Sequence, residues 1–80
     1  MAEDSFPYGK IRTAGELGRL IRKKRLEDGL LQDTVAGLAQ VGVRFLSELE
    51  NGKETAALGK SLQVLSRLGL EVRIVPRGAP

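Results

Sequence analysis

Residues 30–53 read LLQDTVAGLAQVGVRFLSELENGK, and this stretch decides the fold. Its apolar side chains recur at helical spacing in two short runs, at about 32–39 and about 43–51. Gly52 follows the second run directly, and glycine suits the left-handed conformation in which many helices end. We therefore expect two short helices that are joined by a tight turn and stopped by Gly52.

A few small and branched side chains would hold these two helices on a core. The first helix would bury Val35, Ala36 and Ala39, and Ala36 is small enough for two crossing helices to approach closely. The second helix would bury Leu46 and Leu49, which leaves its other faces outward. This spacing is typical of a helix-turn-helix, whose second helix can enter the major groove of DNA.

One helix should precede this motif and another should follow it. Thr13 and Glu16 match a capping box at the start of a helix that Gly29 ends. The apolar stripe of this helix is Leu17, Leu20 and Ile21. The other helix runs from about 57 to 68, with Gly69 as its stop. We expect it to bury a single face made of Leu58, Leu62, Leu65 and Leu68.

The last segment, residues 70–76, changes period. Leu70, Val72 and Ile74 alternate with charged side chains, as on a half-buried strand. No other segment reads as a strand, and one strand cannot form a sheet by itself. This one must pair with the same strand of a second copy, dock on a partner or stay loose. Pairing across a two-fold axis is the simplest solution, and it predicts a homodimer.

Composition narrows the functional classes. The chain has 80 residues, a formal net charge of +3 and a pI of about 9.7, which suits a polyanionic partner without requiring one. It has no cysteine and no histidine, and no pair of carboxylates or hydroxyls stands at a catalytic spacing. We therefore expect no enzyme activity, no metal and no cofactor. The absence of an apolar span or a leader predicts a cytoplasmic protein without membrane contact.

Residues 13–68 resemble the lambda-repressor-like, or Xre-type, helix-turn-helix domains. The match runs without gaps through Leu30-Leu31-Gln32, Val35-Ala36 and Leu46-Ser47-Glu48-Leu49-Glu50-Asn51-Gly52-Lys53. The stretch from Val41 to Lys53, followed by Leu62-Gln63-Val64-Leu65, Leu68-Gly69-Leu70 and the terminal strand, is similar to HipB-type antitoxins. The resemblance covers about three quarters of the chain. It implies a DNA-binding fold, and its HipB-type part implies a HipA-type serine/threonine kinase as partner.

This resemblance implies roles for individual residues. Arg44 would read bases, because its fork can donate two hydrogen bonds to a guanine. Gln32 would fix its helix against a phosphate or the recognition helix, and Arg25 and Glu50 would form a buried ion pair. Asn51, the Gly52 amide and Lys53 would meet phosphate. The implied DNA-binding residues are Gln32, Val43, Arg44, Phe45, Ser47, Glu48, Asn51 and Lys53.

Several of these positions allow a second interpretation. Arg44 could be an ordinary solvated residue, and Glu48 could either read a cytosine or pair with Arg44. Phe45 could touch a thymine methyl group or lie at the edge of the core. The basic run Arg22–Arg25 resembles a nucleic-acid patch. On a helix its four side chains point in different directions, which favours a solvated face.

Two residues depart from the family pattern. Leu31 stands where a threonine usually caps the next helix, and the lost side-chain cap costs about 1 kcal/mol. Gln40 stands where the turn usually has a glycine, and a left-handed conformation there would strain the turn. Gly42 offers an alternative place for the turn. As an N-cap it would also expose the positive end of a helix dipole, which favours phosphate.

Together these patterns predict an all-α fold: a lambda-repressor-like helix-turn-helix bundle of four to five helices with a short C-terminal β-strand pairing across a dimer. Residues 1–12 would be a flexible arm, 13–69 the DNA-binding domain, 70–76 the dimerisation strand and 77–80 a tail. The predicted function is repression at a palindromic double-stranded DNA operator, as the antitoxin of a HipBA-type operon that neutralises a HipA-like kinase. The alternatives are a protein-interaction module without DNA binding and a phage- or restriction-type controller repressor.

Overall fold

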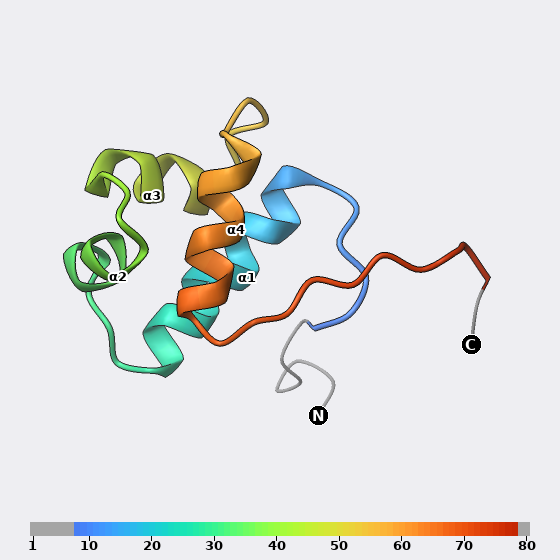
Figure 1. The fold of residues 1–80 in the computed structure, drawn as a ribbon, viewed down its shortest axis with the longest axis horizontal. Coiled ribbons are helices and arrows are strands. Elements are labelled where there is room, and N and C mark those ends of the chain that lie inside the picture. Colours follow the sequence, from blue (N-terminus) through green and yellow to red (C-terminus); the bar gives the residue numbers. More distant parts are fainter. Residues whose placement is uncertain (1–7, 79–80) are drawn as a thin grey trace.

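Four helices organise residues 8–78, the part of the chain that the structure, a computed structural model, describes (Figure 1). They are α1 (Ala14–Glu27), α2 (Gln32–Ala39), α3 (Val43–Glu50) and α4 (Leu58–Arg67). Helix α1 packs on α3, and α2 packs on both α3 and α4. Most of the predicted N-terminal arm, residues 1–7, and the last two residues of the predicted tail lie outside the described part.

The predicted capping box at the start of α1 is confirmed. The Thr13 hydroxyl accepts a hydrogen bond from the Glu16 backbone N–H at 3.0 Å. In return, the Glu16 carboxylate accepts from the backbone N–H groups of Arg12 at 2.6 Å and Thr13 at 3.1 Å. The Arg12 N–H contributes most to holding the pKa of Glu16 below its ordinary value. The start of α1 is therefore fixed by reciprocal side-chain hydrogen bonds.

The core lies between the four helices, and each of them contributes to it. Ile21, Leu46 and Val35 are among its fully buried side chains, and Ala36 is also buried, as the spacing predicts. The core cluster consists of Ile21, Val35, Ala36, Ala39, Leu46, Leu49, Val64, Leu65 and Leu68. The helix-turn-helix is therefore held from inside by its own apolar residues, together with those of α1 and α4.

Helix α4 is rotated relative to the prediction. Leu58 and Leu62 are 72% and 42% exposed, so only Leu65 and Leu68 of the expected face are buried. The buried stripe is instead Ser61, Val64, Leu65 and Leu68. Ser61 fits because it is small and its hydroxyl donates to the Ala57 carbonyl at 2.8 Å, which satisfies the buried oxygen. The sequence pattern missed Ser61 because serine is not apolar, and it favoured Leu58 and Leu62 because leucine is.

The segment after α4 is extended but forms no strand within residues 8–78. Leu70 is half-buried and packs against the core, whereas Val72 is exposed and Ile74 is 93% exposed. A strand needs a neighbouring strand to complete its backbone hydrogen bonds, and no second strand exists in the described part of the chain. The predicted strand is therefore absent from residues 8–78 of the single chain. Its pairing across a dimer stays a prediction.

A close approach of α1 and α3 depends on glycine. A Cβ atom placed on Gly18 would overlap the carbonyl oxygens of Leu49 and Glu50, the second at 2.6 Å. Gly52 also comes close to α1, because a Cβ there would lie 2.9 Å from the Cα of Gly15, and its φ of +84° favours glycine as well. Gly52 is expected from sequence as a helix stop, whereas Gly18 stands inside a helical run without any local signal of this contact.

Substitution of Gly18 by alanine should therefore destabilise the fold. In a helix interior alanine is normally more favourable than glycine. Here, however, its methyl group would push α1 away from the end of α3. We expect a loss of about 1–3 kcal/mol in the free energy of unfolding, measured by urea denaturation. Gly37→Ala is the matched control, because a Cβ at Gly37 in α2 meets nothing within 4 Å. It should leave stability equal or raised by about 0.5–1 kcal/mol, and an equal loss in both variants would contradict this account.

The capping box also predicts a pH dependence. Because the pKa of Glu16 is lowered in the folded chain, its contribution is present above its ordinary pKa of 4.5 and is lost as pH falls through the folded value. In Glu16→Gln the amide can still accept the backbone hydrogen bonds but does not titrate. Between pH 6 and pH 3, the Tm of the unsubstituted chain should fall more steeply than that of the variant. Parallel Tm curves would rule out this role of the carboxylate.

Candidate nucleic-acid interface

The outward face of α3 carries four of the residues that the family resemblance assigns to DNA, namely Val43, Arg44, Ser47 and Glu48. Val43 is exposed and the Arg44 side chain is 91% exposed, while Ser47 and Glu48 are half-buried on the same side. Phe45 is half-buried and packs against the core. It lies at the boundary, and the Lys60 ammonium stands 5.6 Å from its ring centroid, so Phe45 belongs more to the scaffold than to the exposed face.

Glu48 lies between two cations of this surface. Its carboxylate is 3.7 Å from the Arg44 guanidinium and 3.2 Å from the Lys53 ammonium. The pairing with Arg44, one of the two interpretations of Glu48, is therefore present in the free protein. Because one carboxylate contacts both cations, the exposed face of α3 and the residue after Gly52 form a single charge cluster.

Both helices of the motif begin without a side-chain cap. Leu31 precedes α2 and Gly42 precedes α3, and neither makes a capping hydrogen bond. The predicted loss of the cap at Leu31 is confirmed. The backbone N–H groups in the first turn of α3, which begins with Val43 and Arg44, have no side-chain cap. There the positive end of the helix dipole would attract an anion.

The turn between the helices is strained at Gln40. This residue is left-handed, with φ 58° and ψ 43°, whereas Gly42 is extended with φ −74°. The turn therefore does not shift to Gly42. The Gln40 N–H donates to the Gly37 carbonyl at 3.2 Å, and the Gln63 side chain of α4 donates to the Ala39 carbonyl at 2.8 Å. These hydrogen bonds hold a conformation that a glutamine disfavours on its own.

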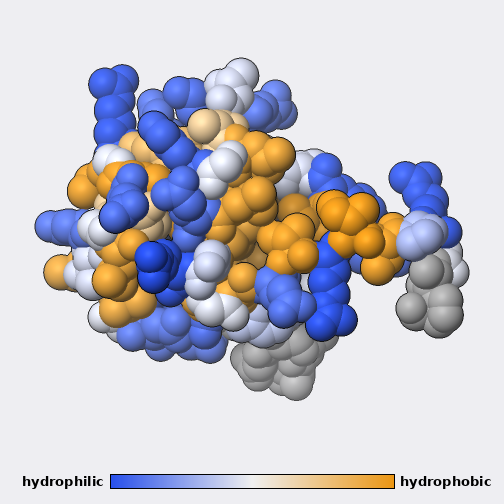
Figure 2. Space-filling view, viewed as in Figure 1, coloured by the Kyte–Doolittle hydropathy of each residue, from blue (hydrophilic) through white to orange (hydrophobic). Residues whose placement is uncertain are grey.

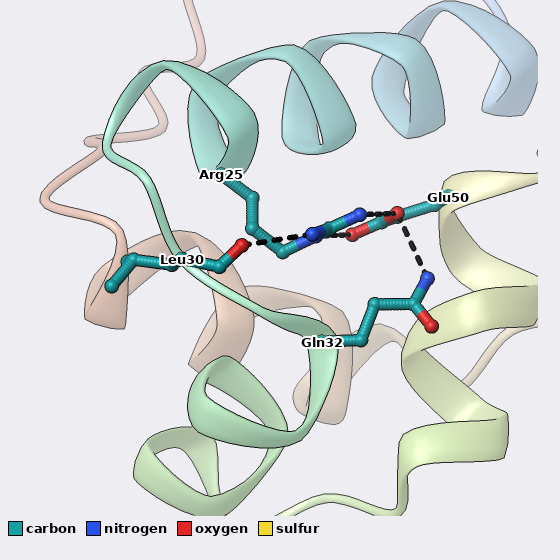
Figure 3. Close-up of polar contacts among 4 residues, drawn as sticks. All are labelled: Arg25, Leu30, Gln32 and Glu50. Atoms are coloured by element: carbon teal, nitrogen blue, oxygen red, sulfur yellow. Dashed lines mark hydrogen bonds and ion pairs between the residues drawn. The ribbon is translucent and has the colours of Figure 1, made fainter.

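A buried ion pair joins α1 to α3 (Figure 3). The Arg25 guanidinium donates to both oxygens of Glu50, at 2.6 and 2.9 Å, and also to the Leu30 carbonyl at 2.9 Å. The hydrogen bond to Glu50 is the main cause that raises the pKa of Arg25. The two-pronged geometry defines both the distance and the orientation between the helices, because two parallel hydrogen bonds resist rotation.

Gln32 completes this network from α2. Its side-chain amide donates to Glu50 at 3.1 Å, so the first residue of α2 contacts the last residue of α3. Of its two expected roles, fixing α2 against the recognition helix is the one present in the free chain. The pair predicted from the family resemblance, Arg25 with Glu50, is likewise present.

The remaining predicted residues separate by position. Asn51 is exposed at the C-terminal end of α3, and Lys53 is 47% exposed beside it. In the basic run, Arg25 is buried and Lys24 pairs with Asp28 at 3.1 Å. The run therefore divides over several directions, as expected. Within residues 8–78, no helix is long and apolar enough to cross a membrane, and no cluster of acidic side chains could hold a metal ion.

Removal of one partner of the buried pair should be costly. In Glu50→Ala the Arg25 charge stays buried and the Gln32 amide loses its acceptor, so we expect a loss of about 3–5 kcal/mol in the free energy of unfolding. Asp28→Ala is the control, because it breaks an ion pair of the same α1 helix at the surface, with little expected effect. Urea denaturation followed by circular dichroism measures both. Equal effects would show that the buried pair does not anchor α3.

No protein-family model matches the chain. The chain is 48% identical over 69 residues to the uncharacterized HTH-type transcriptional regulator y4mF of Sinorhizobium fredii, which covers 86% of this chain and 91% of that protein. The solved HipB-O4 20mer complex and HipA-HipB-O2-O3 complex each contain a chain with a similar fold. For both, the TM-score is 0.80 at 20% identity, over 88% of this chain and 99% of that chain. The fold is thus HipB-like, and at 48% identity to a regulator of this kind the chain belongs to the Xre-like HTH-type transcriptional regulators.

Proposed function

We propose that this chain is a sequence-specific DNA-binding repressor that reads a palindromic operator as a homodimer. The observation that carries the proposal is the exposed face of α3, with Val43, Arg44 and Ser47 outward, on a helix that the Arg25–Glu50 pair holds rigidly to α1. A reading helix must be both exposed and well positioned, because hydrogen bonds to base edges tolerate little misplacement.

Arg44 is the main base-reading residue in this proposal. Its exposed guanidinium can donate two hydrogen bonds to a guanine, and its contact with Glu48 at 3.7 Å is long enough to be exchanged for a base edge. Val43 offers an apolar contact to a thymine methyl group, and Ser47 offers a hydroxyl to either purine or pyrimidine. Glu48 stays beside Arg44 and orients it.

Phosphate contacts would come from the two ends of the motif. The uncapped N-terminal ends of α2 and α3 present backbone N–H groups, and Asn51 and Lys53 lie at the opposite end of α3. Gln32 would meet a phosphate with the part of its amide that Glu50 leaves available. These contacts position the helix without reading sequence.

The dimer in this proposal is formed by residues 70–76. Leu70, Val72 and Ile74 belong to an extended segment whose outer part is exposed and has no strand beside it in the described chain. The same segment of a second copy would supply the missing hydrogen bonds, with residues 13–69 as the DNA-binding unit. Two recognition helices about 34 Å apart would then read two half-sites.

The proposal further assigns the chain as the antitoxin of a HipBA-type operon, with a HipA-like kinase as partner. The support is the fold shared with a chain of the HipA-HipB-O2-O3 complex and the sequence similarity between residues 41–70 and HipB-type antitoxins. The adjoining gene tests this partner. A kinase-like reading frame beside this gene is expected, and a phage or restriction locus in its place would favour a controller repressor instead.

Arg44 and Lys53 should affect DNA binding differently. We expect Arg44→Ala to weaken binding to a duplex selected from a random library by about 1–3 kcal/mol, and to relax preference at one base position in each half-site. Lys53→Ala should weaken binding to all sequences alike and reduce the salt slope by about one. Anisotropy titrations at several salt concentrations measure both effects.

Three results, from these titrations or from nuclease footprinting on the selected duplex, would count against the proposal. A discrete footprint and a steep salt slope are expected of the unsubstituted chain, and their absence would favour a protein-interaction module. Unchanged affinity and preference in Arg44→Ala would refute its role as a base reader. A footprint with one half-site would contradict the dimer.

A further inference from the structure

The positive charge of this chain is not concentrated on its helix-turn-helix. Residues 30–54 carry two cationic and four acidic side chains, whereas residues 8–28 carry seven cationic and three acidic ones. The DNA-facing motif is therefore acidic overall, and the excess of cations lies on α1 and the segment before it. A DNA interface alone does not account for this distribution.

Six cations outside the motif form one connected surface, which we call the basic strip. It consists of Lys10, Arg12, Arg19, Arg22, Lys23 and Arg77, all exposed. Three adjoining hollows connect them. The first is lined by Arg19, Arg22 and Lys23, with Glu27 as its one acidic residue. The second shares Arg19 and Lys23 and adds Lys10, with Glu16 as its one acidic residue. The third shares Lys10 and adds Arg12 and Arg77.

Exposed apolar side chains lie between these cations. Leu26 lines the first hollow and is 54% exposed, Ile11 lines the second and third, and Val75 lines the third and is 66% exposed. Figure 2 shows hydrophobic side chains gathered along the C-terminal segment, with hydrophilic ones directly beneath them. The strip thus combines positive charge with apolar area, which a solvated helix face ordinarily lacks.

The basic strip and the reading face lie on different sides of the molecule. Helix α1 turns Gly18, Ile21 and Arg25 inward, the last onto Glu50 of α3, so the side of α1 that carries the strip faces away from α3. In Figure 1, α2 and α3 lie at one end, whereas the two terminal segments lie at the other. A partner on the strip would leave the exposed face of α3 accessible.

We propose that the basic strip docks an acidic, partly apolar segment of a partner protein. Charge complementarity requires a negatively charged occupant. The interleaved Ile11, Leu26 and Val75 favour protein over nucleic acid, because a DNA backbone presents charge and sugar but little apolar surface to cover them. The proposal goes beyond DNA binding and does not depend on it, since no residue of α2 or α3 takes part.

The probe for this surface is a short fluorescein-labelled peptide of interspersed glutamate and leucine. The full chain is titrated into this peptide, and the fluorescence anisotropy of the peptide is followed. The salt concentration is kept low, because at 0.1 M the Debye length is only about 10 Å and salt screens contacts between exposed charges. Two comparison peptides separate the contributions, one with glutamine for glutamate and one with serine for leucine. The parent peptide should bind several-fold more tightly than either, and amide shifts in an NMR titration should fall on α1 and residues 8–12 and 73–77.

Two double variants that remove the same amount of positive charge are compared, one within the basic strip and one outside it. Arg19→Gln with Arg22→Gln removes two cations of the strip and should weaken peptide binding about tenfold. Lys60→Gln with Arg67→Gln removes two exposed cations of α4 outside the strip and should change it less than about twofold. Circular dichroism verifies that both variants remain folded.

Each remaining outcome contradicts the proposal. Equal binding of the serine peptide would reduce the strip to a general attraction for anions, and equal losses in both double variants would do the same. Amide shifts confined to α3 would place the peptide on the DNA face. Displacement of the peptide from α1 by a DNA duplex, with shifts of the same residues, would make the strip a nucleic-acid surface.

Discussion

The buried pair between Arg25 and Glu50 is the constraint on which the geometry of this domain depends. It joins the last turn of the longest helix to the last residue of α3, and Gln32 and the Leu30 carbonyl complete its hydrogen bonds. Two charges removed from water gain little net stability when they are well paired, but they tolerate no other arrangement. The pair therefore contributes less to how stable the fold is than to which orientation α3 adopts.

Packing acts together with this pair. Gly18 lets the backbone of α1 approach the backbone at the end of α3. Further along α1, the Arg25–Glu50 ion pair prevents the two helices from sliding past each other. On the opposite side, α4 holds α2 through Val64 and Leu65 and closes the Gln40 turn with Gln63. The strained left-handed glutamine persists because the elements on both sides of it are already held.

Local chemistry could be predicted from sequence because its signals lie close together in the chain. Thr13 with Glu16, and the helix stop at Gly52, depend on neighbours a few residues away, and the four-helix bundle followed from apolar spacing. The Arg25–Glu50 pair required the family resemblance, because its partners are 25 residues apart. The prediction for the buried face of α4 was partly wrong, because a leucine in the sequence indicates only that its burial would be favourable. The core had room for Ser61 and left Leu58 and Leu62 outside.

Two parts of the molecule depend on contacts that no local pattern shows. Gly18 looks like a weak point of a helix until α3 is beside it, and the extended segment at 70–76 has no strand to pair with in the described part of the chain. Similarly, the basic strip joins residues from the two ends of the sequence with the middle of α1. Such features arise only when distant segments meet, and pattern reading along one chain does not reach them.

The short length of α2 and α3 and their missing side-chain caps have a consequence for how this protein unfolds and is degraded. Each of these helices has only eight residues, far fewer than an isolated helix needs to persist in water. Their existence depends on the surrounding core, so no partly unfolded form would keep α2 and α3 helical. The helix-turn-helix and the resistance to proteases are therefore lost together, in one cooperative step. For a regulator, this means that turnover of the chain ends its activity cleanly, without leaving fragments that still occupy DNA.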